Sequence, residues 1–125
     1  MRLRTVSAAD LGFIYKLYTH PDILSTCHNK RKYTIGEHCV WWMNRGFNNA
    51  RIILYKDNPV GLIRKDDDSI SIAILPEYQD KGFGTKSIKK FTKNGDTAQV
   101  LWSNLKSLHV FRKAGFKEQY ITLKR

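Results

Sequence analysis

One segment of the chain constrains its fold more than any other, because a strand, a glycine-rich loop and a helix follow one another without interruption. Residues 69–75 alternate polar and apolar side chains, as a half-buried strand does, and the loop 79–85 leads into a lysine-rich helix that we expect at residues 85–94. Gly82 and Gly84 lack a Cβ atom, so successive backbone N–H groups can turn toward one anion at the helix N-terminus. The segment therefore predicts an anion-binding loop for a phosphorylated cofactor.

A second segment, about twenty residues further on, narrows the kind of loop this can be. An apolar run at residues 98–102 leads into Asn104, a helix that we expect at residues 105–114, and a Gly115-Phe116 pair. The glycine loop itself fits neither common nucleotide-binding sequence, because it lacks both the Gly-x-Gly-x-x-Gly pattern and a Gly-Lys-Ser/Thr ending. The order of elements therefore indicates another phosphate-binding family.

In that order the two segments resemble motifs A and B of the GNAT superfamily of N-acetyltransferases. The resemblance is close over residues 51–119 and loose over residues 1–50. It implies that the strand before the glycine loop and the strand before Asn104 begin parallel and then splay. It also implies acetyl-CoA as co-substrate, with the pantetheine arm in the gap between these strands, and no metal.

The resemblance further implies where the cofactor is held. Backbone groups at Ile74 and Leu75 would pair with the pantetheine amides, and N–H groups of the loop 79–85 would hold the pyrophosphate. A backbone N–H near Leu75 would polarise the thioester carbonyl, and the side chain of Asn104 would fix the arm. The cofactor-binding residues that we expect are Ile74, Leu75, Gln79, Asp80, Lys81, Gly82, Phe83, Gly84, Thr85, Asn104, Ser107 and Phe111.

We expect an α+β fold in one domain over residues 1–125, with a GNAT-like mixed central sheet of about six strands, splayed between the fourth and fifth, and helices on both faces. Thr34 and Glu37 form a capping-box sequence at the start of the second helix. The expected strands are residues 2–6, 51–55, 60–64, 69–75, 97–102 and 116–123. The expected helices are residues 8–20, 34–45, 85–94 and 105–114.

The position where many GNAT members carry a tyrosine that protonates the departing sulfur is Phe111 here. A phenyl ring donates no proton, so the sequence leaves three alternatives: Tyr78 or a water is the donor, the thiolate leaves unassisted, or the site is catalytically weak. Positioning the amine and thioester together can by itself lower the barrier by several kcal/mol, so a site with few acid or base groups still functions.

The expected acceptor side lies on the second helix, within Glu37-His38-Cys39-Val40-Trp41-Trp42. His38 is the first candidate for the base that deprotonates the amine, with Glu37 and Glu77 behind it. Its Glu-His-x-x-Trp sequence resembles that of acetyltransferases acting on nucleotide-linked amino sugars, where Trp41 or Trp42 would stack on a sugar or base. The alternative for at least one of these tryptophans is core packing.

The chain has a formal net charge of +11. Such an excess favours anionic partners, and its clusters at residues 30–32 and 86–93 leave open whether the surface is merely solvated. No run of eighteen apolar residues and no signal-peptide sequence is present, so we expect a soluble cytoplasmic protein without a membrane partner. Cys27 and Cys39 lack metal-ligand spacing, and we expect both as reduced thiols.

Three functions therefore compete. The leading one is acetyl-CoA-dependent N-acetylation of a small amine, which can be anionic, with a nucleotide-linked amino sugar first among substrates. The second acetylates a protein or nucleic-acid-linked amine, for which the positive charge is the main argument. The third is a GNAT-like module that binds nucleic acid without strong catalysis. The short C-terminal segment leaves the acceptor side open, or completed by a second subunit in a homodimer.

Overall fold

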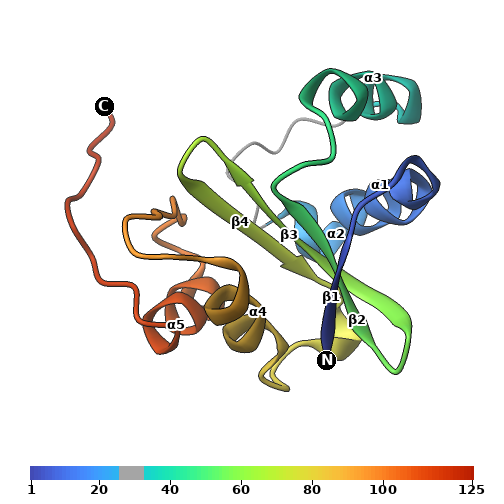
Figure 1. Cartoon of the computed structure of the whole chain (residues 1–125). Coiled ribbons are helices and arrows are strands. Elements are labelled where there is room, and N and C mark those ends of the chain that lie inside the picture. Colours follow the sequence, from blue (N-terminus) through green and yellow to red (C-terminus); the bar gives the residue numbers. More distant parts are fainter. Residues whose placement is uncertain (26–32) are drawn as a thin grey trace.

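The computed structural model describes residues 1–25 and 33–125, so Cys27 and the basic cluster at residues 30–32 lie outside the described residues. The elements follow one another as shown in Figure 1. In chain order they are β1 (Arg2–Thr5), η1 (Ala8–Asp10), α1 (Leu11–Thr19), α2 (Pro21–Leu24), α3 (Ile35–Arg45), β2 (Ala50–Tyr55), β3 (Asn58–Asp66), β4 (Ser69–Ile74), η2 (Pro76–Tyr78), α4 (Phe83–Phe91) and α5 (Leu105–Lys113).

The four strands form one antiparallel sheet in the order β1-β2-β3-β4, which leaves β4 at an edge. The turn between β2 and β3 is tight because Lys56 and Asp57 both adopt left-handed backbone angles, with φ of 49° and 64°. Two left-handed residues in succession match the twist of a hairpin, and they place the turn one residue earlier than the Asp57-Asn58 turn expected from the sequence.

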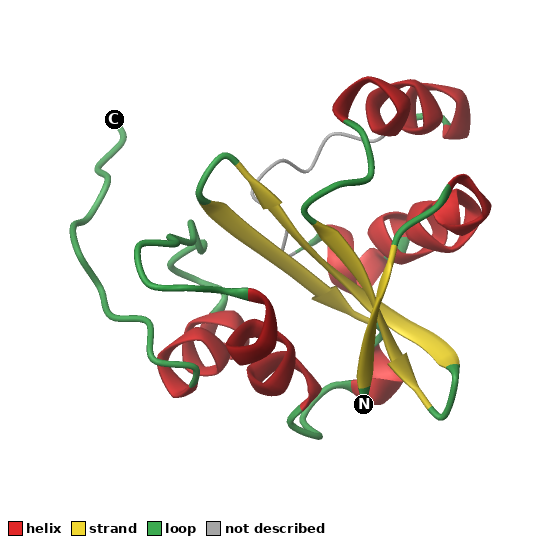
Figure 2. Cartoon of the chain, in the orientation of Figure 1, coloured by secondary structure: helices red, strands yellow, loops and turns green. Residues whose placement is uncertain are grey.

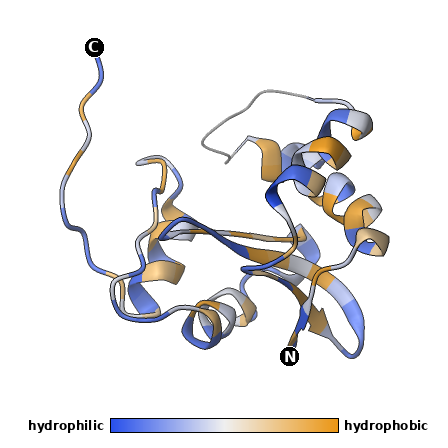
Figure 3. Ribbon diagram, turned by 45° about the horizontal axis from the view of Figure 1, so that its top comes forward, coloured by the Kyte–Doolittle hydropathy of each residue, from blue (hydrophilic) through white to orange (hydrophobic). Residues whose placement is uncertain are grey.

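Helices cover both faces of the sheet, with α1, α2 and α3 on one face and α4 and α5 on the other (Figures 1 and 2). Alternation along the strands divides the buried side chains between these faces. Ile52, Leu62 and Ala73 pack with α1 and α3, whereas Ile53 and Ile63 pack against the α4 and α5 side. Apolar residues accordingly concentrate in the strands and the helices beside them (Figure 3).

The expectation of about six strands was wrong, because the sheet formed by the described residues has four. Residues 97–102 form only one parallel bridge, between Ser69 and Thr97, after which the segment leaves β4. Residues 116–123 form no strand: Phe116 packs on Phe111 of α5, and residues 117–123 are exposed (Figure 1). An alternating sequence becomes a strand only where it runs beside a neighbour that pairs with its backbone, and beyond Thr97 this segment diverges from the free edge of β4.

Sequence patterns at the helix ends predicted the helices more reliably than alternation predicted the strands. The predicted capping box of α3 is confirmed: the Thr34 N–H donates to Glu37 Oε1 at 3.0 Å, and the Glu37 N–H donates to Thr34 Oγ1 at 3.2 Å. Gly46 ends the helix with φ of 84°, a value that favours glycine. Among the described residues, no helix is long and apolar enough to cross a membrane, and no three His, Cys, Asp or Glu side chains gather as a metal site.

Candidate functional site

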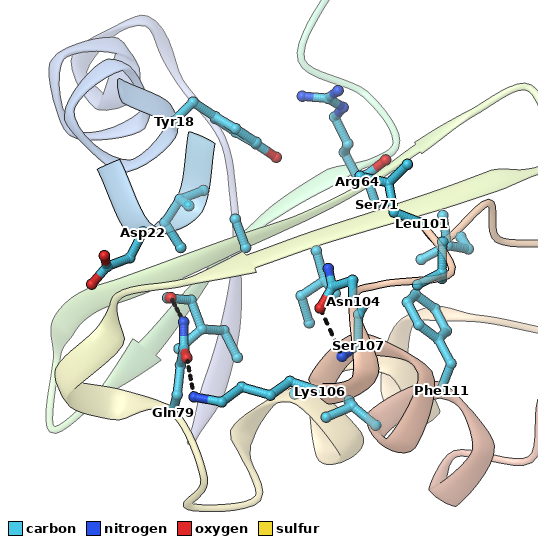
Figure 4. A pocket seen from close by; sticks show the side chains of 18 of the residues that line it. Tyr18, Asp22, Arg64, Ser71, Gln79, Leu101, Asn104, Lys106, Ser107 and Phe111 are labelled. Atoms are coloured by element: carbon cyan, nitrogen blue, oxygen red, sulfur yellow. Dashed lines mark hydrogen bonds between the residues drawn. The ribbon is translucent and has the colours of Figure 1, made fainter. Parts of the chain in front are cut away.

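A large cleft of about 1170 Å³ runs along the free edge of β4 and reaches both faces of the sheet (Figure 4). Its two ends differ in what surrounds them, and we call them the cofactor end and the acceptor end. The cofactor end is lined by Ile72, Ile74, Tyr78, Gln79, Asp80, Gly82, Phe83, Gly84, Thr85, Asn104, Ser107, Val110 and Phe111. The acceptor end is lined by Tyr18, Asp22, Tyr33, Glu37, His38, Trp41, Trp42, Arg64 and Ser71.

The edge of β4 offers unpaired backbone groups to this cleft. The Ile70 N–H donates outward to Thr97 at 2.7 Å, whereas the Leu75 N–H donates inward to the Val60 carbonyl at 2.9 Å. Because backbone groups alternate along a strand, the N–H groups of Ile72 and Ile74 face the open edge. The expectation that the Leu75 N–H serves the cofactor therefore needs correction, since Val60 already occupies that donor and Leu75 does not line the cleft.

The loop after β4 is shaped as the sequence predicts. Asp80 and Gly82 both have positive φ, 62° and 85°, which turns the chain sharply before α4. Within the described part of the chain, the backbone N–H groups from Asp80 to Thr85 form no hydrogen bond. These unpaired donors lie at the N-terminus of α4, a position that suits the binding of a phosphate group.

The two glycines of the loop act differently. Gly82 is the N-cap and needs its left-handed conformation, and a Cβ there would meet nothing within 4 Å. Gly84 lies inside the helix, where a Cβ would come within 3.0 Å of Val110 Cγ1 and 3.5 Å of Ile74 Cδ1. Gly82 therefore shapes the loop, while Gly84 lets α4 approach α5 and β4 closely.

Polar side chains between the loop and α5 close the cofactor end. The Gln79 side chain donates to the Ile74 carbonyl at 2.9 Å, and Lys106 Nζ reaches Gln79 Oε1 at 3.5 Å. Asn104 is the N-cap of α5, and its Oδ1 accepts a hydrogen bond from the Ser107 N–H at 3.2 Å (Figure 4). Its amide oxygen thus orders the helix N-terminus beside the cleft, and the predicted residues Asn104 and Ser107 meet there.

Two predicted loop residues lie outside the cleft lining. Glu77 is exposed on η2, and Lys81 is exposed with its ammonium 5.7 Å from the centroid of the Tyr78 ring. The expectation that Glu77 acts as a base is therefore not supported by its position. Tyr78 itself lines the cleft and packs near Tyr55 and Phe83, while Phe111 is 5 % exposed and packs on Phe116.

His38 lies deep in the acceptor end and is only 2 % exposed. Its Nε2 donates to the Leu11 carbonyl at 3.2 Å, and its ring stacks on Tyr33 with centroids 5.9 Å apart. Burial lowers the pKa of His38, and the positive charge of Arg64 adds to this effect against the opposing hydrogen bond to Leu11. A neutral imidazole tied to α1 suits a wall residue better than a strong base.

Both tryptophans line the cleft, but they differ in burial. Trp42 is 1 % exposed and stacks on Phe47 in the core, while Trp41 is 45 % exposed beside the cleft. The expectation that at least one packs in the core is confirmed for Trp42. Glu37 lies at the rim, where its carboxylate caps α3.

Sequence reasoning missed several lining residues, and Arg64 is the one that carries a charge into the cleft from the sheet. Arg64 lies on β3 beside the acceptor end, although its neighbours in sequence mark it only as a strand residue. Its two-residue spacing from Leu62 places it on the α1 and α3 face, and this alternation was the available signal. What it contacts there depends on helices distant in sequence.

Comparisons with known proteins agree with this geometry. A model of the Acetyltransferase (GNAT) family matches residues 13–116. Spermidine N-acetyltransferase from Vibrio cholerae, solved with CoA and spermine, is 22% identical with a TM-score of 0.78, and the match covers 95% of this chain and 82% of that one. A domain from Methanocaldococcus jannaschii is 24% identical with a TM-score of 0.79, covering 94% and 88%.

Ribosomal-protein-alanine N-acetyltransferase from Brucella melitensis is 16% identical with a TM-score of 0.78, and the match covers 96% of this chain and 86% of that one. No curated protein sequence matches the chain at a significant level. At these identities the solved structures establish the fold, and the acceptors that they are named for, a polyamine and a ribosomal protein, differ from one another.

Proposed function

The chain belongs to the Acetyltransferase (GNAT) family as an acetyl-CoA-dependent N-acetyltransferase, and on that premise we propose that its acceptor is a small primary amine carried by a sugar-like ring. A nucleotide-linked amino sugar is the first candidate. The main observation behind this proposal is that one cleft joins a loop rich in backbone N–H groups to an acceptor end with the half-exposed Trp41 ring. Aromatic faces of this kind stack on flat or weakly polar ring surfaces.

Cofactor binding is supported by three features of the described residues. The backbone N–H groups from Asp80 to Thr85 have no hydrogen-bond partner, and the N–H groups of Ile72 and Ile74 face the open edge of β4. Gly84 lets α4 approach β4 and α5 closely. Bound acetyl-CoA supplies a thioester whose carbonyl carbon accepts an amine. We assign the pyrophosphate to the loop and the pantetheine arm to the edge of β4.

The transfer needs little from side chains. The amine nitrogen forms a bond to the acetyl carbon, the carbon–sulfur bond breaks, and the thiolate accepts a proton from a donor that solvent restores with the proton that the amine releases. We assign polarisation of the carbonyl to an outward N–H of Ile72 or Ile74 and proton donation to the Tyr78 hydroxyl. His38 would shape the acceptor wall, because its Nε2 is committed to Leu11.

Free-thiol release tests this proposal directly. The protein is incubated with acetyl-CoA and UDP-glucosamine, glucosamine, spermidine, or peptides with free N-termini, and CoA release is followed. We expect the fastest turnover with an amino sugar and a KM that rises about tenfold or more in Trp41→Ala, the loss of a stacked ring. Trp41→Phe is the matched control: it keeps an aromatic ring, so its KM should stay close to that of the unaltered protein. Turnover confined to the peptides would overturn the small-amine acceptor.

A further inference from the structure

Arg64 brings a positive charge into the acceptor end from the middle of the sheet. Its Cα partner on β4 is Ser71, so the two side chains emerge from neighbouring strands on the same face (Figure 4). Both line the cleft, and the Arg64 side chain is 21 % exposed. A guanidinium and a hydroxyl therefore stand next to each other where an acceptor would lie.

Aromatic rings hold the guanidinium in place. The Arg64 Cζ atom lies 5.2 Å from the Tyr18 ring centroid and 5.0 Å from the Trp41 ring centroid. Flat, weakly hydrated guanidinium groups stack well on such rings and keep their N–H groups pointing outward in the ring plane. Arg64 is thus ordered before any ligand arrives, so little side-chain freedom is lost on binding.

The local charge is not balanced. Arg64 Nε donates to Asp66 Oδ2 at 3.0 Å, while the other oxygen of Asp66 accepts from Arg45 Nε at 2.6 Å. One carboxylate therefore serves two guanidinium groups. Within residues 1–25 and 33–125, the terminal nitrogens Nη1 and Nη2 of Arg64 have no hydrogen-bond partner.

The acidic groups that also line this end do not neutralise Arg64. Asp22 is exposed in the first turn of α2, and the Glu37 carboxylate accepts from the Thr34 N–H at the exposed start of α3. A largely buried cation with two unpaired donors is stabilised by an anion that accepts both hydrogen bonds.

We propose that Arg64, with the Ser71 hydroxyl beside it, binds a carboxylate or phosphate group of the acceptor, so that the acceptor is an amine that also carries negative charge. This inference rests on the proposed function of the cleft and narrows it. It excludes the purely cationic polyamines as the preferred substrate class. Carboxylates and phosphates present the same paired oxygens to a guanidinium, so the two are separated by experiment.

The test measures binding to the CoA-saturated protein, so that the phosphate loop is already filled. Tryptophan fluorescence reports binding, because Trp41 lies against Arg64. Two matched pairs are titrated at constant ionic strength: glucosamine with glucosamine 6-phosphate, and butylamine with 4-aminobutanoate. We expect the anionic member of at least one pair to bind about tenfold or more tightly, as charge-assisted hydrogen bonds allow. The pair that responds identifies phosphate or carboxylate.

Arg64→Gln should reduce this advantage to less than about threefold, and Arg64→Lys should keep part of it, because a lysine retains charge but not the paired geometry. Arg51→Gln is the control for loss of one positive charge, since Arg51 lies against Phe91 outside the cleft. An undiminished advantage in Arg64→Gln, or no advantage in the unaltered protein, would overturn the proposal.

Two further measurements keep the test decisive. Should Arg64→Gln not fold by its melting curve, the free anion of the pair that responds (inorganic phosphate for the glucosamine pair, acetate for the butylamine pair) must displace the anionic member but not its partner from the unaltered protein, and failure to do so overturns the proposal. Thiol release is followed separately. Anion-dependent binding without thiol release for any amine contradicts the proposed function but supports the role of Arg64. Turnover without anion preference supports the proposed function but overturns the role of Arg64.

Discussion

The Leu75 N–H donates to the Val60 carbonyl at 2.9 Å, one residue beyond the end of β4. This bond fixes which backbone groups of the strand point toward β3 and which point toward the cleft. It assigns Leu75 to the sheet and Ile74 to the open edge, because the direction of successive N–H groups alternates. The oxyanion donor expected at Leu75 is therefore to be sought at Ile74 or Ile72.

Proline substitutions distinguish these two positions, because proline removes a single N–H. Ile74→Pro removes an outward donor and no ladder bond, so we expect a folded protein with at least about tenfold weaker CoA binding by calorimetry. Leu75→Pro removes the bond to Val60, and we expect a lower melting temperature instead. Ile74→Val controls for the lost side chain. Normal CoA affinity in Ile74→Pro would contradict pairing of the cofactor with this edge.

Substitutions of the two loop glycines should cause different defects, one in CoA binding and one in stability. Gly82→Ala must hold φ near 85° with a Cβ, which costs about 1–2 kcal/mol and distorts the loop, so CoA affinity should fall. Gly84→Ala brings a Cβ against Val110, and overpacking of about 1–3 kcal/mol should lower the melting temperature.

The double variant Gly84→Ala with Val110→Ala should recover most of that loss, because it removes the crowded methyl group. Gly84→Asp should abolish CoA binding, since it adds a carboxylate beside the phosphate loop. An unchanged CoA affinity in Gly84→Asp, measured by calorimetry on folded protein, would remove the loop as the pyrophosphate site.

Tyr78 and Phe111 are tested as a pair. If Tyr78 donates the proton to sulfur, Tyr78→Phe should lower kcat about ten- to a thousandfold with CoA affinity little changed. Phe111→Tyr adds a hydroxyl at the position where the family resemblance implies a tyrosine, and it should leave turnover unchanged or raise it. It should also restore activity to Tyr78→Phe. A slow Phe111→Tyr variant with normal CoA affinity would show that the packing around Phe111 leaves no room.

His38 predicts a pH dependence of stability. Its folded pKa is below the ordinary value of 6.5, so the unfolded chain binds more protons as the pH falls through that value. The stability conferred by neutral His38 is therefore full above about pH 6.5 and declines as the solution is acidified toward the lower folded pKa. The carboxyl groups with lowered pKa, such as Asp10 and Asp66, change the stability only at lower pH, below the ordinary carboxyl pKa.

Melting temperatures at about pH 7.5 and 5.5 measure this effect, since the interval brackets the ordinary histidine pKa. We expect a smaller decrease in His38→Gln than in the unaltered chain. The glutamine amide can still donate to Leu11, so turnover should remain within about tenfold if His38 only shapes the wall. A loss of a hundredfold or more, in the range of acid–base catalysis, would instead identify His38 as the base.

The sequence by itself determined the features that depend on near neighbours. The capping box of Thr34 and Glu37, the left-handed Gly82 and the N-cap Asn104 are local, because each is set by bonds within about one helical turn. The glycine loop and the Asn-led helix were enough to indicate the family and the cofactor. Strand boundaries were less certain where only alternation supported them.

Tertiary structure decided everything that depends on a partner distant in sequence. The segments 97–102 and 116–123 have suitable residues, but apart from the bridge at Thr97 they do not run beside the open edge of β4, so the sheet stops at β4. Trp41 and Trp42 are adjacent in sequence, yet the packing of α3 on α1 exposes one and buries the other. Arg64 becomes a cleft residue only because Tyr18, Trp41 and Asp66 converge on it, and no local pattern encodes such a convergence.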